Sequence, residues 1–207
     1  MPLHETTAHA LIFDWGGVLM RTIDYTPRHV WDAALGMQRG AVESVVHGCP
    51  EWIEAQCGRL STEEYWQAVA WRLGLSVQQR EALREAFYSG DRLDTRLVDL
   101  VQQQRRQGVR VALLSNNIRE LRDDLTEIGL NSLFEPCVIS AEIGVMKPER
   151  KAYEAVLALV GLPAGRCLFI DDSQANVTGA QTAGLEAVLY TPELDLQAVI
   201  SQWTAHL

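Results

Sequence analysis

The sequence predicts an α/β fold, in which a doubly wound parallel sheet carries a small α-helical domain inserted after its first strand. Two observations lead to this prediction. Short apolar runs without polar alternation, typical of strands buried on both faces, alternate with helix-length segments over most of the chain. Residues 21–89 instead contain helix-start signals and no convincing strand. We therefore expect residues 1–20 and 90–207 to form the α/β core and residues 21–89 to form the helical domain.

The strands of the core are predicted from five apolar runs, at residues 10–14, 109–115, 135–140, 166–171 and 185–190. The segments around the later runs predict helices at residues 94–108, 117–129, 148–160, 173–183 and about 193–204. Glycine, which readily takes the left-handed conformation that ends a helix, follows four of them, at Gly108, Gly129, Gly161 and Gly184. Regular alternation of this kind predicts a doubly wound parallel sheet.

The inserted domain is predicted from its helix-start patterns. Thr26-Pro27 is suited to open a helix, because proline fits the first helical turn. Ser61 and Ser76 each precede a glutamate or glutamine by three residues, which is the capping-box pattern. The stretch "QCGRLST", residues 56–62, predicts a turn between two of the helices. Four side chains of this domain are candidates for contact with a substrate: Arg28, His47, Trp52 and Arg59.

The composition limits the classes of partner. The 207-residue chain is 47% hydrophobic and 22% charged, with a net charge of −9. Nucleic acids and anionic membranes attract basic surfaces, so neither is expected, whereas a small phosphorylated metabolite needs only a local cation. The first ten residues lack a basic and apolar leader, no apolar run reaches membrane-spanning length, and the four cysteines form no CxxC pair. We therefore expect a cytoplasmic protein with free thiols.

Four of the predicted strands lead into residues that carry charge or hydrogen-bonding groups, namely Asp14, Ser115 with Asn116, Lys147, and Asp171 with Asp172. Ligands of open parallel sheets bind outside the carboxyl ends of the strands, so we expect these residues to meet at one edge. Carboxylates that lie close together repel one another unless a cation separates them, and oxygen ligands of this kind suit Mg²⁺. The pattern therefore predicts a magnesium site.

The same residues are suited to phosphate chemistry. With a cation and Lys147 in place, the edge holds a phosphate dianion, and Ser115 and backbone N–H groups bind its oxygens. A carboxylate can then attack phosphorus to form an aspartyl-phosphate, which is a known form of covalent catalysis.

Four motifs, "FDWGGVL", "LLSNN", "MKPERKAY" and "FIDDSQANVTGA", together resemble those of the haloacid dehalogenase superfamily in order and spacing. The resemblance extends over essentially the whole chain, and the inserted segment is similar to the family's helical cap. It implies that Asp14 is the nucleophile and that Lys147 neutralises charge. It also implies that Ser115 and Asn116 bind phosphate.

The resemblance further implies a Mg²⁺ site. Asp172 is expected to be a direct ligand, and Asp171 is expected to be either a ligand or a supporting partner. Asp14 and the backbone oxygen of Gly16 are expected to complete the protein's share of the ligands. Asn176 is close enough in sequence to support the acidic loop.

The first motif departs from the family at Gly16, where most phosphatases of this superfamily carry a second aspartate that moves protons. Such general acid–base help is worth on the order of 100- to 10,000-fold in rate. Gly17 is expected to let the chain turn tightly, and the ring of Trp15 is expected to face the cavity. We therefore place Trp15, Gly16 and Gly17 among the substrate- and phosphate-binding residues.

Three functions are compatible with a glycine at this position. The first is a Mg²⁺-dependent phosphatase for a small phosphomonoester such as a sugar phosphate, resembling the α-glucose-1-phosphatase-like branch with its DxGxV motif. The second is a 2-haloacid dehalogenase, which needs neither the metal nor the second acid because a halide leaves without a proton. The third is a weakly active or inactive protein that binds a partner through its cap.

Overall fold

The computed structural model describes residues 8–207, so most of the N-terminal stretch considered above lies outside the described residues. A five-stranded sheet in the order β5-β4-β1-β6-β7 forms its centre, and all neighbouring strands are parallel. The strands are β1 (Ala10–Phe13), β4 (Arg110–Ser115), β5 (Cys137–Ile139), β6 (Cys167–Asp171) and β7 (Glu186–Leu189). Each lies within one of the predicted apolar runs, so the predicted parallel sheet is confirmed.

Strand β1 lies in the middle of the sheet and is buried along its whole length. Ile12 is paired with Ala112 of β4 on one side and with Phe169 of β6 on the other. Successive side chains of a strand point to opposite faces. Leu11 and Phe13 accordingly belong to one apolar cluster, and Ile12 belongs to the other.

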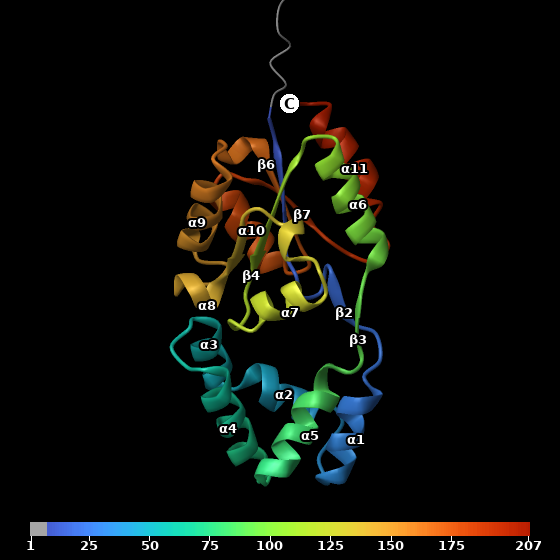
Figure 1. The fold of residues 1–207 in the computed structure, drawn as a ribbon, viewed down its shortest axis with the longest axis vertical. Coiled ribbons are helices and arrows are strands. Elements are labelled where there is room, and N and C mark those ends of the chain that lie inside the picture. Colours follow the sequence, from blue (N-terminus) through green and yellow to red (C-terminus); the bar gives the residue numbers. More distant parts are fainter. Residues whose placement is uncertain (1–7) are drawn as a thin grey trace, which may run out of the picture.

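Helices cover both faces of the sheet (Figure 1). One face, with Leu11 and Phe13, packs against α6 (Thr95–Arg106), α7 (Leu121–Glu127) and α11 (Leu196–Thr204). The other packs against α9 (Arg150–Val160) and α10 (Gln174–Thr182). The shorter elements are α8 (Ser140–Ile143), η1 (Asn131–Leu133) and η2 (Ala164–Arg166). None of the helices within residues 8–207 has the length and apolar character required to cross a membrane.

The helix predicted for residues 117–129 is shorter than expected, because α7 begins only at Leu121. The backbone N–H of Asn117 donates to Ser140 Oγ at 3.0 Å. The Asn117 side chain accepts from the N–H of Ile118 at 2.8 Å. Asparagine side chains that bond the neighbouring backbone compete with helix formation in this way. The residues after β4 therefore form a loop at the edge of the sheet.

Five helices form a second body beside the sheet (Figure 1). They are α1 (Thr26–Ala34), α2 (Ala41–Gly48), α3 (Pro50–Gln56), α4 (Thr62–Leu73) and α5 (Val77–Tyr88), and we call them the cap helices. They enclose an apolar cluster of their own, with Tyr65 and Trp66 fully buried. The capping boxes predicted at Ser61 and Ser76 are both present, and the predicted turn separates α3 from α4.

Two short antiparallel strands connect the cap helices to the sheet, β2 (Met20–Thr22) and β3 (Asp91–Leu93). This corrects the expectation that residues 21–89 contain no strand, because β2 includes Arg21 and Thr22. Strands of three residues are too short to produce a readable alternation of polar and apolar positions.

Arg28 joins the cap helices to these strands and is only 3% exposed. Its guanidinium donates to the backbone oxygen of Phe87 at 2.9 Å and to Glu43 at 2.8 Å. It also donates to Thr22 Oγ1 at 2.8 Å and to Asp91 at 3.1 Å. Because these protein groups surround the guanidinium, Arg28 has a structural role. The expectation that it contacts a substrate is therefore corrected.

Candidate active site

The carboxyl ends of three neighbouring strands bring the predicted polar residues together. Asp14 follows β1 directly, and its N–H donates to the backbone oxygen of Ile170 in β6 at 2.9 Å. Asp171 ends β6, and Ser115 ends β4 on the opposite side of β1. The parallel order of the strands therefore places these three residues at one edge of the sheet.

Lys147 reaches this edge from the loop after α8 and is 1% exposed. Its Nζ lies 2.8 Å from Asp14 Oδ1 and 2.6 Å from Asp171 Oδ2. Asp14, Asp171 and Asp172 each offer a carboxylate oxygen, and these oxygens lie within 4.8 Å of one another. A single ammonium thus faces three carboxylates, which leaves negative charge at the site for a further cation to balance.

The two adjacent acids have different surroundings. Asp171 is fully buried, and its carboxylate accepts from Lys147, from Asn176 Nδ2 at 3.0 and 3.1 Å, and from the N–H of Ser173 at 2.8 Å. Asp172 is exposed. The hydrogen bonds of Asp171 hold it in place as a partner of Lys147, whereas the carboxylate of Asp172 is open to an incoming ion.

The pKa values of the site reflect this crowding. The pKa of Asp14 is raised to about 7, because burial and the charge of Asp171 raise it by more than Lys147 lowers it. Burial and the charge of Asp171 also raise the pKa of Asp172. Carboxylates that repel one another and are partly removed from water bind a hard divalent cation favourably. The donor set therefore fits Mg²⁺.

Asn116 has a role that sequence reasoning missed. Its Oδ1 accepts from the backbone N–H of Lys147, and its Nδ2 donates to the backbone oxygen of Lys147, both at 2.8 Å. The side-chain amide is therefore engaged with the lysine backbone and fixes the loop that carries Lys147. Asn116 is a positioning residue through its side chain, which leaves its backbone N–H as the group for the predicted phosphate contact.

The residues after Asp14 differ from expectation at Trp15. Trp15 is 5% exposed and packs in the apolar cluster that contains Phe13. The expectation that its ring faces the cavity is therefore wrong, because the ring continues the inward-facing positions of β1. The backbone N–H of Trp15 donates to Asp14 Oδ1 at 2.7 Å, so its contribution to the site is to orient that carboxylate.

The two glycines of the first motif occupy different environments. Gly17 has φ +80°, and a Cβ at this position would overlap the carboxylate of Asp172. Gly16 is exposed, and a Cβ added there would meet nothing within 4 Å. The absence of a side chain is thus required at Gly17 and is sterically unnecessary at Gly16.

This contrast predicts opposite outcomes for two neighbouring substitutions. Gly17→Ala is expected to lower the free energy of unfolding by more than the roughly 1–2 kcal/mol of a left-handed alanine, because Asp172 must also move. Gly16→Ala is expected to change it by less than about 0.5 kcal/mol. Urea unfolding of both variants checks the prediction, and equal losses would contradict it.

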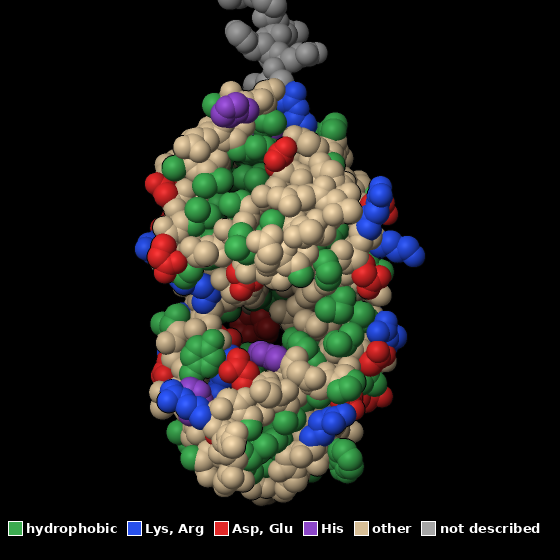
Figure 2. Space-filling view, turned by 180° about the vertical axis from the view of Figure 1, so that it is seen from behind, with side chains coloured by type: hydrophobic (Ala, Val, Ile, Leu, Met, Phe, Trp, Pro, Cys, Tyr) green, Lys and Arg blue, Asp and Glu red, His purple; other side chains and the backbone are tan. Residues whose placement is uncertain are grey.

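A hollow separates the sheet edge from the cap helices, with acidic side chains at its floor and a histidine at its rim (Figure 2). Among the cap candidates, the ring of His47 lies 5.2 Å from that of Trp52 and 5.0 Å from that of Phe87. One side of His47 is open to solvent, yet burial by these neighbours lowers its pKa to about 4. His47 is therefore neutral at pH 7 and is poorly suited to supply the missing acid.

Arg59 is exposed, and its guanidinium donates two hydrogen bonds to the carboxylate of Glu54, at 2.5 and 2.8 Å.

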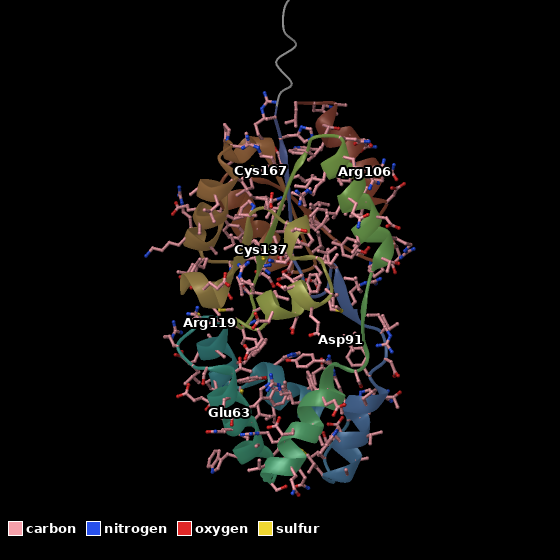
Figure 3. The ribbon with its side chains drawn as sticks, viewed as in Figure 1. Glu63, Asp91, Arg106, Arg119, Cys137 and Cys167 are labelled. Carbon is pink, nitrogen blue, oxygen red and sulfur yellow. The ribbon has the colours of Figure 1, made fainter. Side chains whose placement is uncertain are left out.

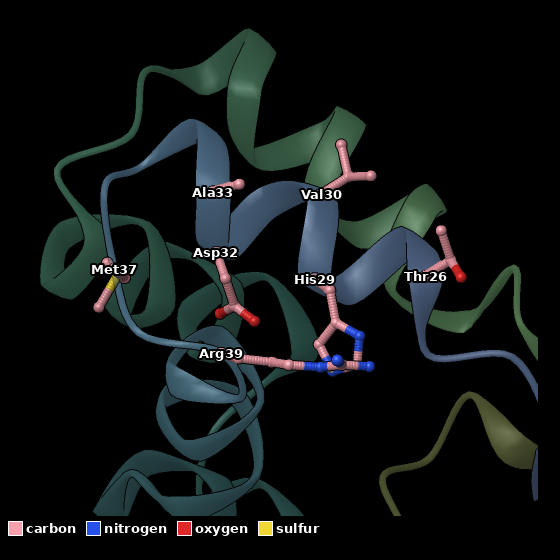
Figure 4. A pocket seen from close by; sticks show the side chains of 7 residues that line it. All are labelled: Thr26, His29, Val30, Asp32, Ala33, Met37 and Arg39. Carbon is pink, nitrogen blue, oxygen red and sulfur yellow. The ribbon is translucent and has the colours of Figure 1, made fainter.

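A separate shallow pocket of about 420 Å³ lies on α1, away from these residues (Figure 4). Its Asp32 accepts from the N–H groups of Gly40 and Val42 at 2.7 and 2.8 Å, and Arg39 donates to His29 at 3.2 Å. Asp32 thus serves the start of α2, and none of the predicted site residues lines this pocket.

The fold and this edge of the sheet define a class of protein. Residues 8–184 match the family model of the haloacid dehalogenase-like hydrolases, and the chain belongs to this family. It is therefore a hydrolase.

Two relatives that match most of the chain carry phosphatase names. A sesquiterpene phosphatase of Aspergillus oryzae is 26% identical over 194 residues, which cover 91% of this chain and 93% of that protein. A phosphoserine phosphatase of Thermus thermophilus is 30% identical over 171 residues, covering 78% of this chain and 68% of that protein.

Solved structures of the same family share the fold. A family enzyme of Bacteroides thetaiotaomicron, in complex with magnesium and inorganic phosphate, has a TM-score of 0.76 at 23% identity and covers 93% of this chain and 98% of its own. The L-2-haloacid dehalogenase of Xanthobacter autotrophicus has a TM-score of 0.67 at 18% identity and covers 96% of this chain and 83% of its own. At these identities, the likeness concerns the fold alone.

Proposed function

We propose that the protein hydrolyses a small phosphomonoester, such as a sugar phosphate, in a Mg²⁺-dependent reaction with Asp14 as the nucleophile. The observation that carries the proposal is the charge arrangement at the sheet edge. One buried lysine contacts Asp14 and Asp171, while Asp172 remains exposed beside them. This arrangement suits a cation and a phosphate dianion together.

The residues for the metal are Asp14, Asp172 and the backbone oxygen of Gly16, with Asp171 supporting the site through Lys147. When bound, Mg²⁺ supplies positive charge that offsets the repulsion between these carboxylates and the phosphate oxygens. Lys147 is already in place to add to that charge, because its Nζ contacts Asp14.

The reaction proceeds in two displacements. A carboxylate oxygen of Asp14 attacks phosphorus, and the bond from phosphorus to the leaving oxygen breaks, so the phosphoryl group is attached to Asp14. The leaving oxygen takes its proton from water, since Gly16 offers none. Water then attacks the same phosphorus, the bond to Asp14 breaks, and inorganic phosphate and the free carboxylate result. The side chain of Trp15 takes no part, but its N–H keeps Asp14 oriented.

The names of the relatives support the reaction class and leave the substrate open. A sesquiterpene phosphatase and a phosphoserine phosphatase act on phosphorylated compounds of different character. The substrate of this chain is proposed to be a small phosphorylated metabolite, selected by the cap helices.

A substrate panel tests the proposal. Purified protein is expected to release phosphate from at least one small phosphomonoester with Mg²⁺ and to stop when EDTA is added. Chloride release from 2-chloropropionate without metal would instead support the dehalogenase function. The exposed Asp172 disfavours that function, because halide displacement needs no cation. Absence of both activities would favour a binding role for the cap.

The empty space at Gly16 gives a further prediction. Gly16→Asp is expected to fold normally, because an added Cβ meets no neighbour within 4 Å. It is expected to raise turnover of alkyl phosphates by up to about 100-fold, and turnover of p-nitrophenyl phosphate much less, since only a poor leaving group needs a proton. Gly16→Asn, which has the same size without the acid, is the control. An equal effect of Gly16→Asp on both substrates would contradict the account.

A further inference from the structure

The turn between α3 and α4 contacts the core at two points. Gln56, the last residue of α3, donates from Nε2 to the backbone oxygen of Asn116 at 2.8 Å and is 7% exposed. Two residues later, Gly58 has φ +68°, and a Cβ there would overlap the backbone oxygen of Ala141 in α8. Figure 1 shows α3 directly beside α8, and Figure 3 places Arg119 at this junction. The turn thus meets the core through a side chain at Gln56 and through its backbone at Gly58.

The first of these contacts is linked to the nucleophile. Gln56 holds the carbonyl of Asn116, and the side chain of Asn116 holds both backbone groups of Lys147 at 2.8 Å. Lys147 in turn contacts Asp14 at 2.8 Å. A continuous series of polar contacts therefore leads from the cap helices to the attacking carboxylate.

The second contact secures the same loop from another side. Ala141 directly follows Ser140 in α8, and Ser140 Oγ accepts from the N–H of Asn117. Ile118, the next residue, packs against the apolar cluster of the cap helices. The loop formed by residues 116–118 is therefore clamped between α8 and the cap helices.

We propose that the α3–α4 turn is a latch that couples docking of the cap helices to the position of Lys147, with Gln56 as a positioning residue. When the latch is docked, Gln56 fixes Asn116, and Asn116 fixes the lysine loop. When the cap helices separate from the core, the contacts of Gln56 with Asn116 and of Gly58 with Ala141 break together, and the loop of residues 116–118 is no longer held by the cap helices. The effect on catalysis rests on the proposed phosphatase function, whereas the docking itself does not.

Gly58→Ala tests the docking, with Gly74→Ala as its matched control. Gly58 lies in the α3–α4 turn and Gly74 directly follows α4, with nearly equal φ of +68° and +67°, but a Cβ at Gly74 meets nothing within 4 Å. Both alanines therefore take a left-handed φ, and only the alanine at position 58 also meets the core. Amide hydrogen exchange of peptides covering residues 116–118 and 140–144 is expected to accelerate about tenfold in Gly58→Ala and to match wild type in Gly74→Ala. Equal exchange in both variants would overturn the latch.

Gln56→Glu tests the hydrogen bond, because a carboxylate of the same size cannot donate to the Asn116 oxygen at neutral pH. We expect faster exchange at residues 116–118 and, on any substrate found, a kcat lower by about fivefold with little change in KM. Wild-type exchange and kcat in this variant would overturn the role of Gln56. If no phosphomonoester is hydrolysed, the phosphatase proposal fails, while the exchange comparison still decides the latch.

Discussion

Replacing Asp14 with asparagine is expected to lower phosphate release by about a thousandfold or more and to leave the protein folded. An amide oxygen is a poor nucleophile, so the covalent step is lost, and no other group at this edge of the sheet occupies the same position between Lys147 and Trp15. Acid quenching during turnover of a ³²P-labelled substrate should trap label on wild type and none on the variant.

The same substitution is expected to make the protein more stable at pH 8. The pKa of Asp14 in the folded protein is raised to about 7, mainly by burial, whereas in the unfolded chain it is near 4. The folded state therefore favours the protonated carboxyl. The stability that this gives is fully present below pH 4 and is lost as the pH rises through 7. The asparagine carries no charge at any pH and avoids this loss. Thermal unfolding without metal should show a higher melting temperature for Asp14→Asn than for wild type at pH 8, and a smaller increase at pH 5.

Undiminished turnover of Asp14→Asn would rule out Asp14 as the nucleophile.

Lys147→Met is expected to reduce both stability and activity strongly. The ammonium is buried and contacts two carboxylates, and removing one partner from a buried ion pair typically costs about 3–5 kcal/mol. Methionine preserves most of the side-chain volume, so the lost stability reports the missing charge. Urea unfolding at pH 7 should show a lower free energy of unfolding. Phosphate release should also fall, because the site loses its positive charge.

Lys151→Met is the control for this change. Lys151 lies on α9, four residues after Lys147, and is exposed, so its loss is expected to alter stability by less than about 0.5 kcal/mol. The difference in the free energy of unfolding between wild type and Lys147→Met should become smaller as the pH falls toward 4. At that pH Asp14 is neutral and no longer needs a counter-ion. A difference of constant size across this range would show that packing, rather than charge, accounts for the loss.

The sheet was predictable because its strands are buried on both faces. Runs such as residues 10–14 and 166–171 contain no polar alternation, and the acids follow directly where the strands end. Adjacency of β1 and β6 in a parallel sheet then suffices to bring Asp14 beside Asp171. The grouping of Asp14, Ser115 and Asp171 thus followed from strand pattern and topology, whereas the position of Lys147 depends on the loop between α8 and α9.

Other features depended on contacts that no local pattern records. The link from Gln56 to Asn116 joins residues 60 positions apart, and β2 and β3 are too short to be recognised. Trp15 was misplaced although a signal was available. Leu11, Phe13 and Trp15 lie two residues apart and belong to the same apolar cluster, so the alternation of β1 continues past its end.

Lys147 has a chemical consequence of its own, because the chain contains two lysines and the other, Lys151, is exposed. Amine-directed reagents meet one accessible ε-ammonium on the described surface, so the protein can be coupled to a support or a dye at Lys151 without touching the catalytic edge. Acylation of Lys147 then requires that this edge open to solvent. Mass spectrometry of the labelled peptides measures acylation of Lys151 and of Lys147 in a single sample.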